Sequence, residues 1–326
     1  MKRMVVDTAN LLFRVHAAQA YKNKGDDLAG LAMHVSLNTL KSFYKKHKPD
    51  QIAVAFEGGQ NWRKAYTASE QCISKRGYKA NRVKDPSMIP FFELIKGFEE
   101  LAREHTSLVC LSHPKLEGDD LISGYAKRFA EEGDEVIILS GDKDFTQLLK
   151  YPNITLINPD DGKPRLCEDP DFFMFEKCFR GDKGDNVMSA YPRVRLDRLK
   201  RAYSDEYELT KIMNETWKFK DPETGVETEF LVQDLFIENN LLMNLDAQPE
   251  EIQAAIRETL DHELVHHGRF SHFHFMKFCG KYELVTIAEQ AASFAEMFSV
   301  TGKYSPHKEE TKAIHEAKKA SALIEF

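Results

Sequence analysis

Nine acidic residues stand where a divalent-metal centre could form. Asp7, Glu57 and Asp142 each lie within three residues after a short apolar run. The other six are Glu117, Asp119, Asp120, Asp144, Asp182 and Asp185. Because like charges repel, so many carboxylates in one place require neutralising cations. Carboxylate oxygens suit Mg²⁺ or Mn²⁺, and two such ions roughly 3.5–4 Å apart can activate a water for phosphodiester cleavage.

The apolar runs next to these acids have the length of buried strands. They cover residues 4–6, 52–56, 108–111, 136–139 and 154–157. Helical patterns separate them at residues 28–46, 91–105 and 119–130. Strands that alternate with helices predict an α/β fold with a mostly parallel sheet and helices on both faces. The carboxyl ends of parallel strands share one edge, so the acids that follow them are expected to meet there.

Each acid has an ordinary structural role as an alternative. Asp119 and Asp120 could cap a helix, and Asp142 and Asp144 could form a turn. Asp182 and Asp185 would share one face if their segment were helical. The joint pattern, acids after four successive strands plus this spaced pair, favours a shared site.

Basic residues are clustered, although the formal net charge is −7. Residues 62–84 contain seven basic residues and one acid, and residues 193–201 contain five basic residues and one acid. A polyanion senses the local potential within about 10 Å, not the total charge. Both clusters are therefore candidate nucleic-acid contacts, with a solvated helix face as the alternative.

Composition narrows the class of protein. The five cysteines are scattered without CxxC spacing, which argues against a disulfide framework or a thiolate zinc site. No apolar run is long enough to span a bilayer, and the first residues leave no room for a signal peptide. We expect a soluble cytoplasmic protein that contacts no membrane.

A zinc-protease pattern offers an alternative to the interpretation based on the acidic residues. Residues 262–266 match HExxH, and His272 has the spacing of a third ligand. The apolar stripe of this predicted helix, which includes Leu260 and Leu264, puts His262 on the wetter face. In a chain with 12 histidines, one chance HExxH match arises with a probability of about a few per cent. We expect the neighbouring phenylalanines, Phe270 to Phe278, to pack in the core.

Five motifs together resemble the flap endonuclease and 5′→3′ exonuclease family. They are VDTANLLFR at residues 6–14, YKANR at 78–82, EGDD at 117–120, SGDKDFTQLL at 140–149 and GDKGDN at 181–186. All five occur in the order of the family, over about residues 4–190. Residues 144–153 and 181–187 also resemble the ribonuclease H of T-even-type phages, so a phage-encoded protein in a host cytoplasm is expected.

The resemblance implies a PIN-like nuclease domain at residues 1–180, with a helical arch at about 58–90. It also implies a mainly helical DNA-binding region at 181–300 that begins with a helix-three-turn-helix element, and a linker and tail at 301–326. Asp7, Glu57, Glu117 and Asp119 would build the first metal site, with Asp120 in support. Asp142, Asp144, Asp182 and Asp185 would build the second. Lys79 and Arg82 would contact the scissile phosphate, Tyr78 would stack on a terminal base, and Arg63 matches a basic position at the start of the arch.

Two positions depart from the family pattern. Glu57 stands where the family usually has Asp, which changes the reach of that carboxylate by about 1.5 Å. The hairpin after Asp185, residues 189–195, contains no glycine that would let backbone amides approach a duplex phosphate. We expect side-chain charge to replace that contact, from Arg193, Arg195, Arg198, Lys200 and Arg201.

The expected function is that of a divalent-metal-dependent 5′ nuclease with ribonuclease H activity. Its substrates would be DNA and RNA:DNA hybrids with 5′ ends or flaps, and its role the removal of RNA primers in lagging-strand replication. The alternatives are a structure-specific DNA-binding module with little hydrolysis and a PIN-type RNA nuclease. We expect a monomer whose apolar last residues, 323–326, either contact a single-strand-binding protein or sliding clamp, or fold back on the body.

Overall fold

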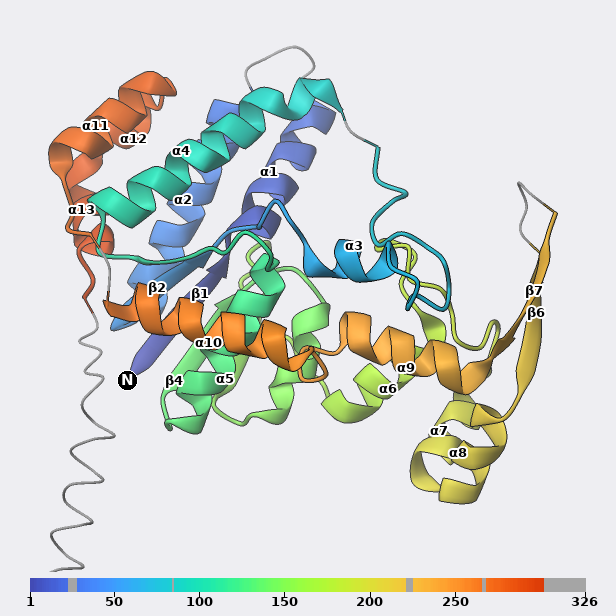
Figure 1. Ribbon diagram of the computed structural model, residues 1–326. Coiled ribbons are helices and arrows are strands. Elements are labelled where there is room, and N and C mark those ends of the chain that lie inside the picture. The colour runs from blue at the N-terminus through green and yellow to red at the C-terminus, as the bar shows by residue number, and fades with distance from the viewer. Residues whose placement is uncertain (23–27, 84, 221–224, 266–267, 302–326) are drawn as a thin grey trace, which may run out of the picture.

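A five-stranded parallel sheet lies at the centre of the molecule (Figure 1). The structure is a computed structural model that describes residues 1–22, 28–83, 85–220, 225–265 and 268–301. The strand order is β3-β2-β1-β4-β5, and every pair is parallel. The strands are β1 (Lys2–Asp7), β2 (Gln51–Ala55), β3 (Val109–Leu111), β4 (Glu135–Leu139) and β5 (Ile154–Ile157). The order reverses at β1, which is where open α/β sheets form ligand crevices at their carboxyl edge.

Alternate strand residues point into two separate cores. Met4 and Val6 of β1 pack with helices α1 (Thr8–Lys22), α2 (Leu28–His47) and α4 (Ile89–His105). Val5 points to the opposite face, toward α5 (Gly118–Glu131) and α10 (Glu250–Val265). Burial on both faces explains why the strands are continuous apolar runs. All five predicted strands and the three predicted helices are confirmed, within a few residues at their ends.

The predicted arch region is helical over only a small part of its length. It contains α3 (Trp62–Thr67) and a short 3₁₀ helix, η1 (Pro86–Met88). Residues 68–83 form turns and bends between them. This turn-rich part, called the arch segment below, lies beside the residues that follow α6 (Pro170–Arg180), because Lys79 N donates to Asp185 O over 2.9 Å.

Residues 170–243 form a lobe to one side of the sheet (Figure 1). It contains α6, α7 (Leu196–Ser204), α8 (Glu206–Met213) and α9 (Val232–Met243). It also contains an antiparallel hairpin of β6 (Thr216–Lys220) and β7 (Glu227–Leu231). Helices dominate this part of the chain, as the sequence predicted, but the hairpin was not predicted. Residues 181–195 between α6 and α7 form turns, and the helix-three-turn-helix element stays a prediction.

The chain then returns to the sheet. The helix α10 packs on α5, and α11 (His272–Lys281), α12 (Val285–Glu289) and α13 (Ala291–Phe298) join the core beside α2 and α4. The short helix η2 (Asp144–Lys150) follows β4. Among the described helices, none is both long and apolar enough to cross a bilayer. The predicted domain limits stay predictions, and the tail at 302–326 lies outside the described residues.

Candidate active site

Ser140 ties two strand ends together at the carboxyl edge of the sheet. Asp7 is the last residue of β1, and Asp142 follows β4 by three residues. The Ser140 hydroxyl donates to Asp7 Oδ2 over 2.7 Å and accepts from Asp142 N over 3.0 Å. Asp7 Oδ1 also accepts from Asn10 N over 2.9 Å. Ser140 therefore links the Asp7 carboxylate to the backbone of Asp142, whose Oδ1 accepts from Asp144 N over 2.8 Å.

Gly58 brings the end of β2 to the start of α5. Its amide donates to Leu116 O over 2.9 Å. A Cβ at this position would lie 2.2 Å from His113 O, so only glycine lets the two loops cross this closely. As a result, Glu57 Oε1 lies within 3.6 Å of where a Cβ of Gly118 would stand, beside the acids at the start of α5.

The first group of acids consists of Asp7, Glu57, Glu117, Asp119 and Asp142, which influence one another electrostatically. Burial raises the pKa of Asp7 to about 6, and the charge of Asp142 adds to the rise. Burial, followed by the charge of Glu117, raises the pKa of Glu57 to about 7. Burial and then the charges of Asp7, Asp142, Glu57 and Glu117 raise the pKa of Asp119 well above its usual range. The edge thus holds more negative charge than its own cations neutralise.

The second group of acids lies where η2 and the end of α6 meet. Lys177 of α6 donates to Asp144 Oδ1, and its ammonium lies 3.2 Å from Asp182 Oδ2. Asp182 Oδ1 accepts from Gly184 N over 2.8 Å and from Asp185 N over 3.2 Å. Asp182 and Asp185 therefore lie on a tight turn, and the helical face considered in the sequence analysis is wrong.

Lys177 affects the ionisation of the acids in this second group. Burial raises the pKa of Asp144, although the charge of Lys177 opposes the rise. At Asp182 burial also disfavours the charged form, but Lys177 outweighs it and the pKa is lowered. Neither Lys177 nor Ser140 was among the predicted site residues. The role of Ser140 could have been inferred from the sequence, because it stands directly before the Gly141-Asp142 turn. Nothing in the sequence around Lys177 indicates that it belongs to the site.

The arch segment places a lysine and a tyrosine between the two groups of acids. Lys79 Nζ lies 2.5 Å from Glu117 Oε1 and 4.0 Å from Asp185 Oδ2. The Tyr78 hydroxyl lies 2.7 Å from Asp185 Oδ2 and 3.2 Å from Glu117 Oε2. Arg82 pairs with Asp185 Oδ1 over 2.7 Å and is largely exposed. The Tyr78 ring is buried in this arrangement, which does not support the predicted stacking on a terminal base.

Arg63 is buried and does not reach the surface. It donates to Asp120 over 2.8 and 3.0 Å, to Glu117 Oε2 over 2.9 Å and to Leu242 O over 2.7 Å. Only 2% of the residue is exposed, so the predicted nucleic-acid contact of Arg63 does not fit the structure. Burial disfavours its charge, but Asp120 and Glu117 raise its pKa above the usual range. Arg63 instead holds two acids in place.

Both oxygens of Asp120 are occupied by hydrogen-bond donors. They accept from Arg63, from Trp62 Nε1 over 3.1 Å, from Gln248 Nε2 over 2.5 Å and from Glu117 N over 3.0 Å. Burial opposes ionisation, but Arg63 lowers the pKa of Asp120. This environment suits the supporting role that the resemblance implies for Asp120.

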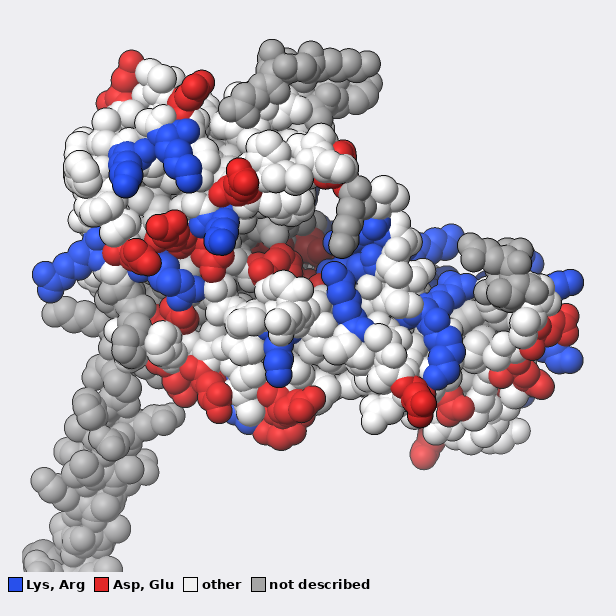
Figure 2. All heavy atoms as spheres, turned by 45° about the horizontal axis from the view of Figure 1, so that its top comes forward, with Lys and Arg blue, Asp and Glu red and all other residues white. Residues whose placement is uncertain are grey.

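The predicted basic residues after the turn are mostly free to meet a ligand. Arg193, Arg195, Lys200 and Arg201 are exposed around the start of α7. Arg198 differs, because it pairs with Glu215 and donates to Tyr191 Oη over 2.6 Å. Figure 2 shows acidic side chains set back in a recess near the middle of the face, with basic side chains to its right.

The donor set suits hard divalent cations, because all the candidate ligands offer carboxylate oxygens and four of them, Asp7, Glu57, Asp119 and Asp144, have raised pKa values. In the described ranges of the chain, no three His, Cys, Asp or Glu side chains stand in a finished metal-binding arrangement. Lysine and arginine side chains hold several of the carboxylates instead, notably Lys79, Lys177 and Arg63. The assignment of metal ligands stays a prediction.

Two residues of the HExxH match, His262 and Glu263, can be placed, and their Nδ1 and Oε1 atoms lie 3.4 Å apart. His262 is exposed on α10, whereas Glu263 is buried and pairs with Arg103 over 2.5 Å. His266 lies outside the described residues. Phe275 and Phe278 of α11 are buried as expected, but Phe273 is 71% exposed.

The fold and the acidic edge are consistent with one class of proteins, the 5′→3′ exonuclease family. A family model for the 5′-3′ exonuclease N-terminal, resolvase-like domain matches residues 2–174, and the chain belongs to this family. The match covers the sheet, the arch segment and all the predicted site residues before Asp182.

Relatives in the flap endonuclease and ribonuclease H groups resemble this chain over about half its length. Ribonuclease H of Enterobacteria phage T4 is 28% identical over 174 residues, 51% of this chain and 55% of the relative. Flap endonuclease Xni of Shewanella piezotolerans is 33% identical over 155 residues, 47% of this chain and 54% of the relative. The chain thus spans about half the length of these relatives. It spans 21% of the thermostable DNA polymerase I of Thermus filiformis, at 28% identity over 56% of this chain.

Solved structures share the fold at low sequence identity. The T5 D15 protein co-crystallized with metal ions superposes with a TM-score of 0.55 at 17% identity, over 80% of this chain and 99% of that one. The T5 D15 flap endonuclease in a complex with DNA and metal ions gives 0.55 at 16% identity, over 81% of this chain and 99% of that one. The likeness in fold covers more of the chain than the family match at residues 2–174 does.

Proposed function

We propose that this chain is a divalent-metal-dependent 5′ nuclease that hydrolyses phosphodiesters in DNA and in the RNA strand of RNA:DNA hybrids. The observation that carries the proposal is the convergence of Asp7, Glu57, Asp119 and Asp142 on one buried edge, where burial and mutual repulsion raise pKa values. The T4 ribonuclease H and Xni relatives, and the metal and DNA complexes of the T5 protein, support this reaction class.

The proposed cofactor is a pair of Mg²⁺ ions, for which Mn²⁺ can substitute. Asp7, Glu57, Glu117 and Asp119 would hold the first ion, and Asp142, Asp144, Asp182 and Asp185 the second. When bound, such ions supply an activated water and neutralise charge on the leaving oxygen. Ser140 keeps Asp7 and Asp142 adjacent, and Arg63 with Asp120 orients Glu117.

Lys79 and Arg82 would bind the scissile phosphate. Both cations lie on the arch segment and pair with acids of the site. A phosphate that enters with its counterions would release Lys79 from Glu117, and the ammonium would then offset negative charge that develops on the phosphate oxygens. Arg193, Arg195, Lys200 and Arg201 are proposed to bind the duplex backbone by charge alone, with Arg198 contributing from its pair with Glu215.

The proposed role is removal of RNA primers and 5′ flaps in lagging-strand replication by a monomer. A single-strand-binding protein or a sliding clamp is the proposed protein partner. Deletion of residues 305–326 should lower processivity when these partners are present. Equal processivity with and without the deletion would contradict the partner proposal alone.

Cleavage assays test the proposed function. Substrates with a labelled 5′ end (a flap, a nicked duplex and an RNA:DNA hybrid) are incubated with Mg²⁺ or with EDTA. We expect short 5′ products in Mg²⁺ only. Binding without cleavage would favour a DNA-binding module, and cleavage of structured RNA alone would favour a PIN-type RNA nuclease.

Acid-to-amide variants test the residues. Asp142→Asn and Asp182→Asn should each abolish cleavage while DNA binding persists, because each loses one ligand charge. Asp261→Asn, on an exposed acid of α10 that pairs with Arg128, is the matched control and should cleave normally. Full activity in either site variant would contradict the proposed mechanism.

A further inference from the structure

The loop between α9 and α10 reaches the back of the acidic site through one buried amide. Gln248 is only 4% exposed, and its Nε2 donates to Asp120 Oδ1 over 2.5 Å. Neither the motifs nor the apolar pattern singled out this residue. It lies about 130 positions from Asp120 in the chain, and beyond the segment that the family model matches.

A continuous set of hydrogen bonds leads from this amide to a proposed metal ligand. Asp120 accepts from Gln248 with Oδ1 and from Trp62 with Oδ2, and it holds both terminal nitrogens of Arg63. The same Arg63 Nη1 lies 2.9 Å from Glu117 Oε2. The position of the Glu117 carboxylate therefore depends on Arg63, and that of Arg63 on Asp120.

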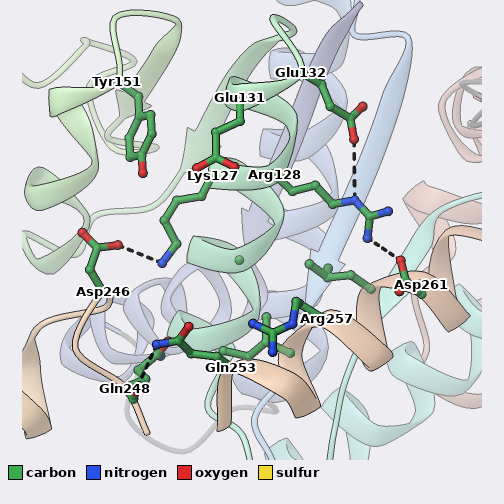
Figure 3. A pocket seen from close by; sticks show the side chains of 13 residues that line it. Lys127, Arg128, Glu131, Glu132, Tyr151, Asp246, Gln248, Gln253, Arg257 and Asp261 are labelled. Atoms are coloured by element: carbon green, nitrogen blue, oxygen red, sulfur yellow. Dashed lines mark hydrogen bonds and ion pairs between the residues drawn. The ribbon is translucent and has the colours of Figure 1, made fainter. Parts of the chain in front are cut away.

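The loop itself is fastened from outside. Lys127 donates to Leu245 O over 2.8 Å and pairs with Asp246 over 2.9 Å. Gln253 donates to Gln248 O over 2.9 Å. Figure 3 shows these side chains around a cavity of about 670 Å³ between α5 and α10. Because the loop is held at both ends, the Gln248 amide has little freedom to leave Asp120.

A neutral donor has a specific advantage at this place. Asp120 pairs with both terminal nitrogens of Arg63, so its charge neutralises that buried guanidinium. A lysine or arginine at position 248 would compete with Arg63 for Asp120, whereas a side chain without a donor would leave a buried carboxylate oxygen short of one partner. The amide satisfies the oxygen and adds no charge.

We propose that Gln248 is a positioning residue that fixes Arg63 through Asp120 and thereby orients Glu117 for metal binding. This inference rests on the proposed function, because Glu117 is a ligand only if the acids bind metal. Gln248 does not touch the substrate or the ions. Its loss should act on metal affinity more than on stability or on DNA binding.

Direct metal binding tests the proposal without relying on activity. Mn²⁺ is titrated calorimetrically into the DNA-free full chain, as wild type and as Gln248→Met, which keeps the length of the side chain but lacks the donor. Partners that orient metal ligands are typically worth 10- to 100-fold in metal affinity, and we expect a loss of about 10-fold at the tighter site. Arg257→Met, which removes a largely exposed side chain from the same cavity and contacts neither Gln248 nor Asp120, should bind Mn²⁺ as the wild type does.

A second variant separates positioning from packing. Gln248→Asn keeps the amide but shortens its reach, so it should lose Mn²⁺ affinity in the same direction, with melting temperatures recorded for each variant. Wild-type affinity in both Gln248 variants would overturn the inference and leave the nuclease proposal intact. A wild-type protein that neither binds Mn²⁺ nor cleaves would overturn the proposed function itself.

Discussion

The Lys79 ammonium lies 2.5 Å from Glu117 Oε1, although the two residues belong to the arch segment and to the start of α5. Glu117 is only 3% exposed, so this is a nearly dry ion pair. The same ammonium lowers the pKa of Glu57 and of Asp7, against the larger effect of their burial. The arch segment is thus coupled to the charge state of the acids.

Removal of this ammonium should shift the pH dependence of cleavage. In Lys79→Met the pKa values of Glu57 and Asp7 should rise further, so the acids would deprotonate, and become able to bind metal, only at higher pH. We expect the acidic limb of the pH–rate profile to move to higher pH and the maximal rate to fall by roughly 100-fold. The measurement is cleavage of a labelled flap between pH 5 and 9.

Lys75→Met is the matched control for that experiment. Lys75 lies in the same arch segment, but its ammonium donates to Glu70 O and does not touch the acids. The acidic limb of the pH–rate profile of Lys75→Met should coincide with that of the wild type. An unshifted limb in Lys79→Met would show that Lys79 does not control the ionisation of the site.

The stability of the metal-free protein should fall as pH rises from about 4 to about 7. The folded pKa of Asp7 is about 6 against an ordinary 3.8, and that of Glu57 is about 7 against 4.5. Between these values the folded state binds more protons than the unfolded state, which makes the folded state less stable as pH increases. The effect is on the order of 3 kcal/mol per group and levels off above pH 7.

Thermal melting in EDTA at pH 5 and pH 7.5 measures this effect, and added Mn²⁺ should restore stability at the higher pH only. Asp7→Asn removes one of the two groups and should flatten the dependence. A metal-free melting temperature that increases steadily from pH 5 to pH 7.5 would contradict the account of these two carboxylates.

Two arginines of the same region should behave in opposite ways. Arg63→Gln leaves buried Asp120 without its cation and Glu117 with Lys79 alone, which should lower the free energy of unfolding by about 3–5 kcal/mol. Arg82→Gln removes a largely exposed side chain, so stability should hardly change while cleavage declines. Denaturant unfolding and flap cleavage of both variants check this. Equal stability of the two variants would be inconsistent with a buried role for Arg63.

The exposed arginines before α7 should determine how duplex binding depends on salt. Reversal of Arg193 and Arg195 to Glu should weaken binding and reduce the slope of log K against log salt by about 1.8, if each neutralises one phosphate. A double reversal of Lys277 and Lys281, exposed on α11, serves as the control and should leave the slope alone. An unchanged slope in the Arg193 and Arg195 variant would show that these arginines do not contact the duplex.

The sheet was predictable because its strands are buried on both faces and therefore stand out as unbroken apolar runs. The hairpin of β6 and β7 was not predicted, because only one of its faces is covered by other residues. Trp217 and Phe230 pack inward, while Lys218 and Glu229 alternate with them on the exposed side. Such short alternating segments, flanked by helical patterns, give a weak strand signal.

The acids of the site were predictable for a topological reason, since the ends of parallel strands must share an edge. The direction in which individual side chains point could not be predicted from the sequence. Arg63 and Tyr78 belong to a basic, polar stretch that favours the surface, yet the lobe of residues 170–243 covers both, and their polar atoms pair with acids. Lys177 and Gln248 come from that lobe and the loop after it, so their contacts depend on a packing that no local pattern reveals.

The location of bound metal tests the central claim most directly. A crystal of the full chain soaked in Mn²⁺ and measured at the manganese absorption edge reports the ion positions without reference to activity. Two anomalous peaks are predicted, one bounded by Asp7, Glu57, Glu117 and Asp119 and one bounded by Asp142, Asp144, Asp182 and Asp185. Absence of any peak at this edge of the sheet, with manganese bound elsewhere, would contradict the assignment of these carboxylates as the metal-binding centre of a nuclease.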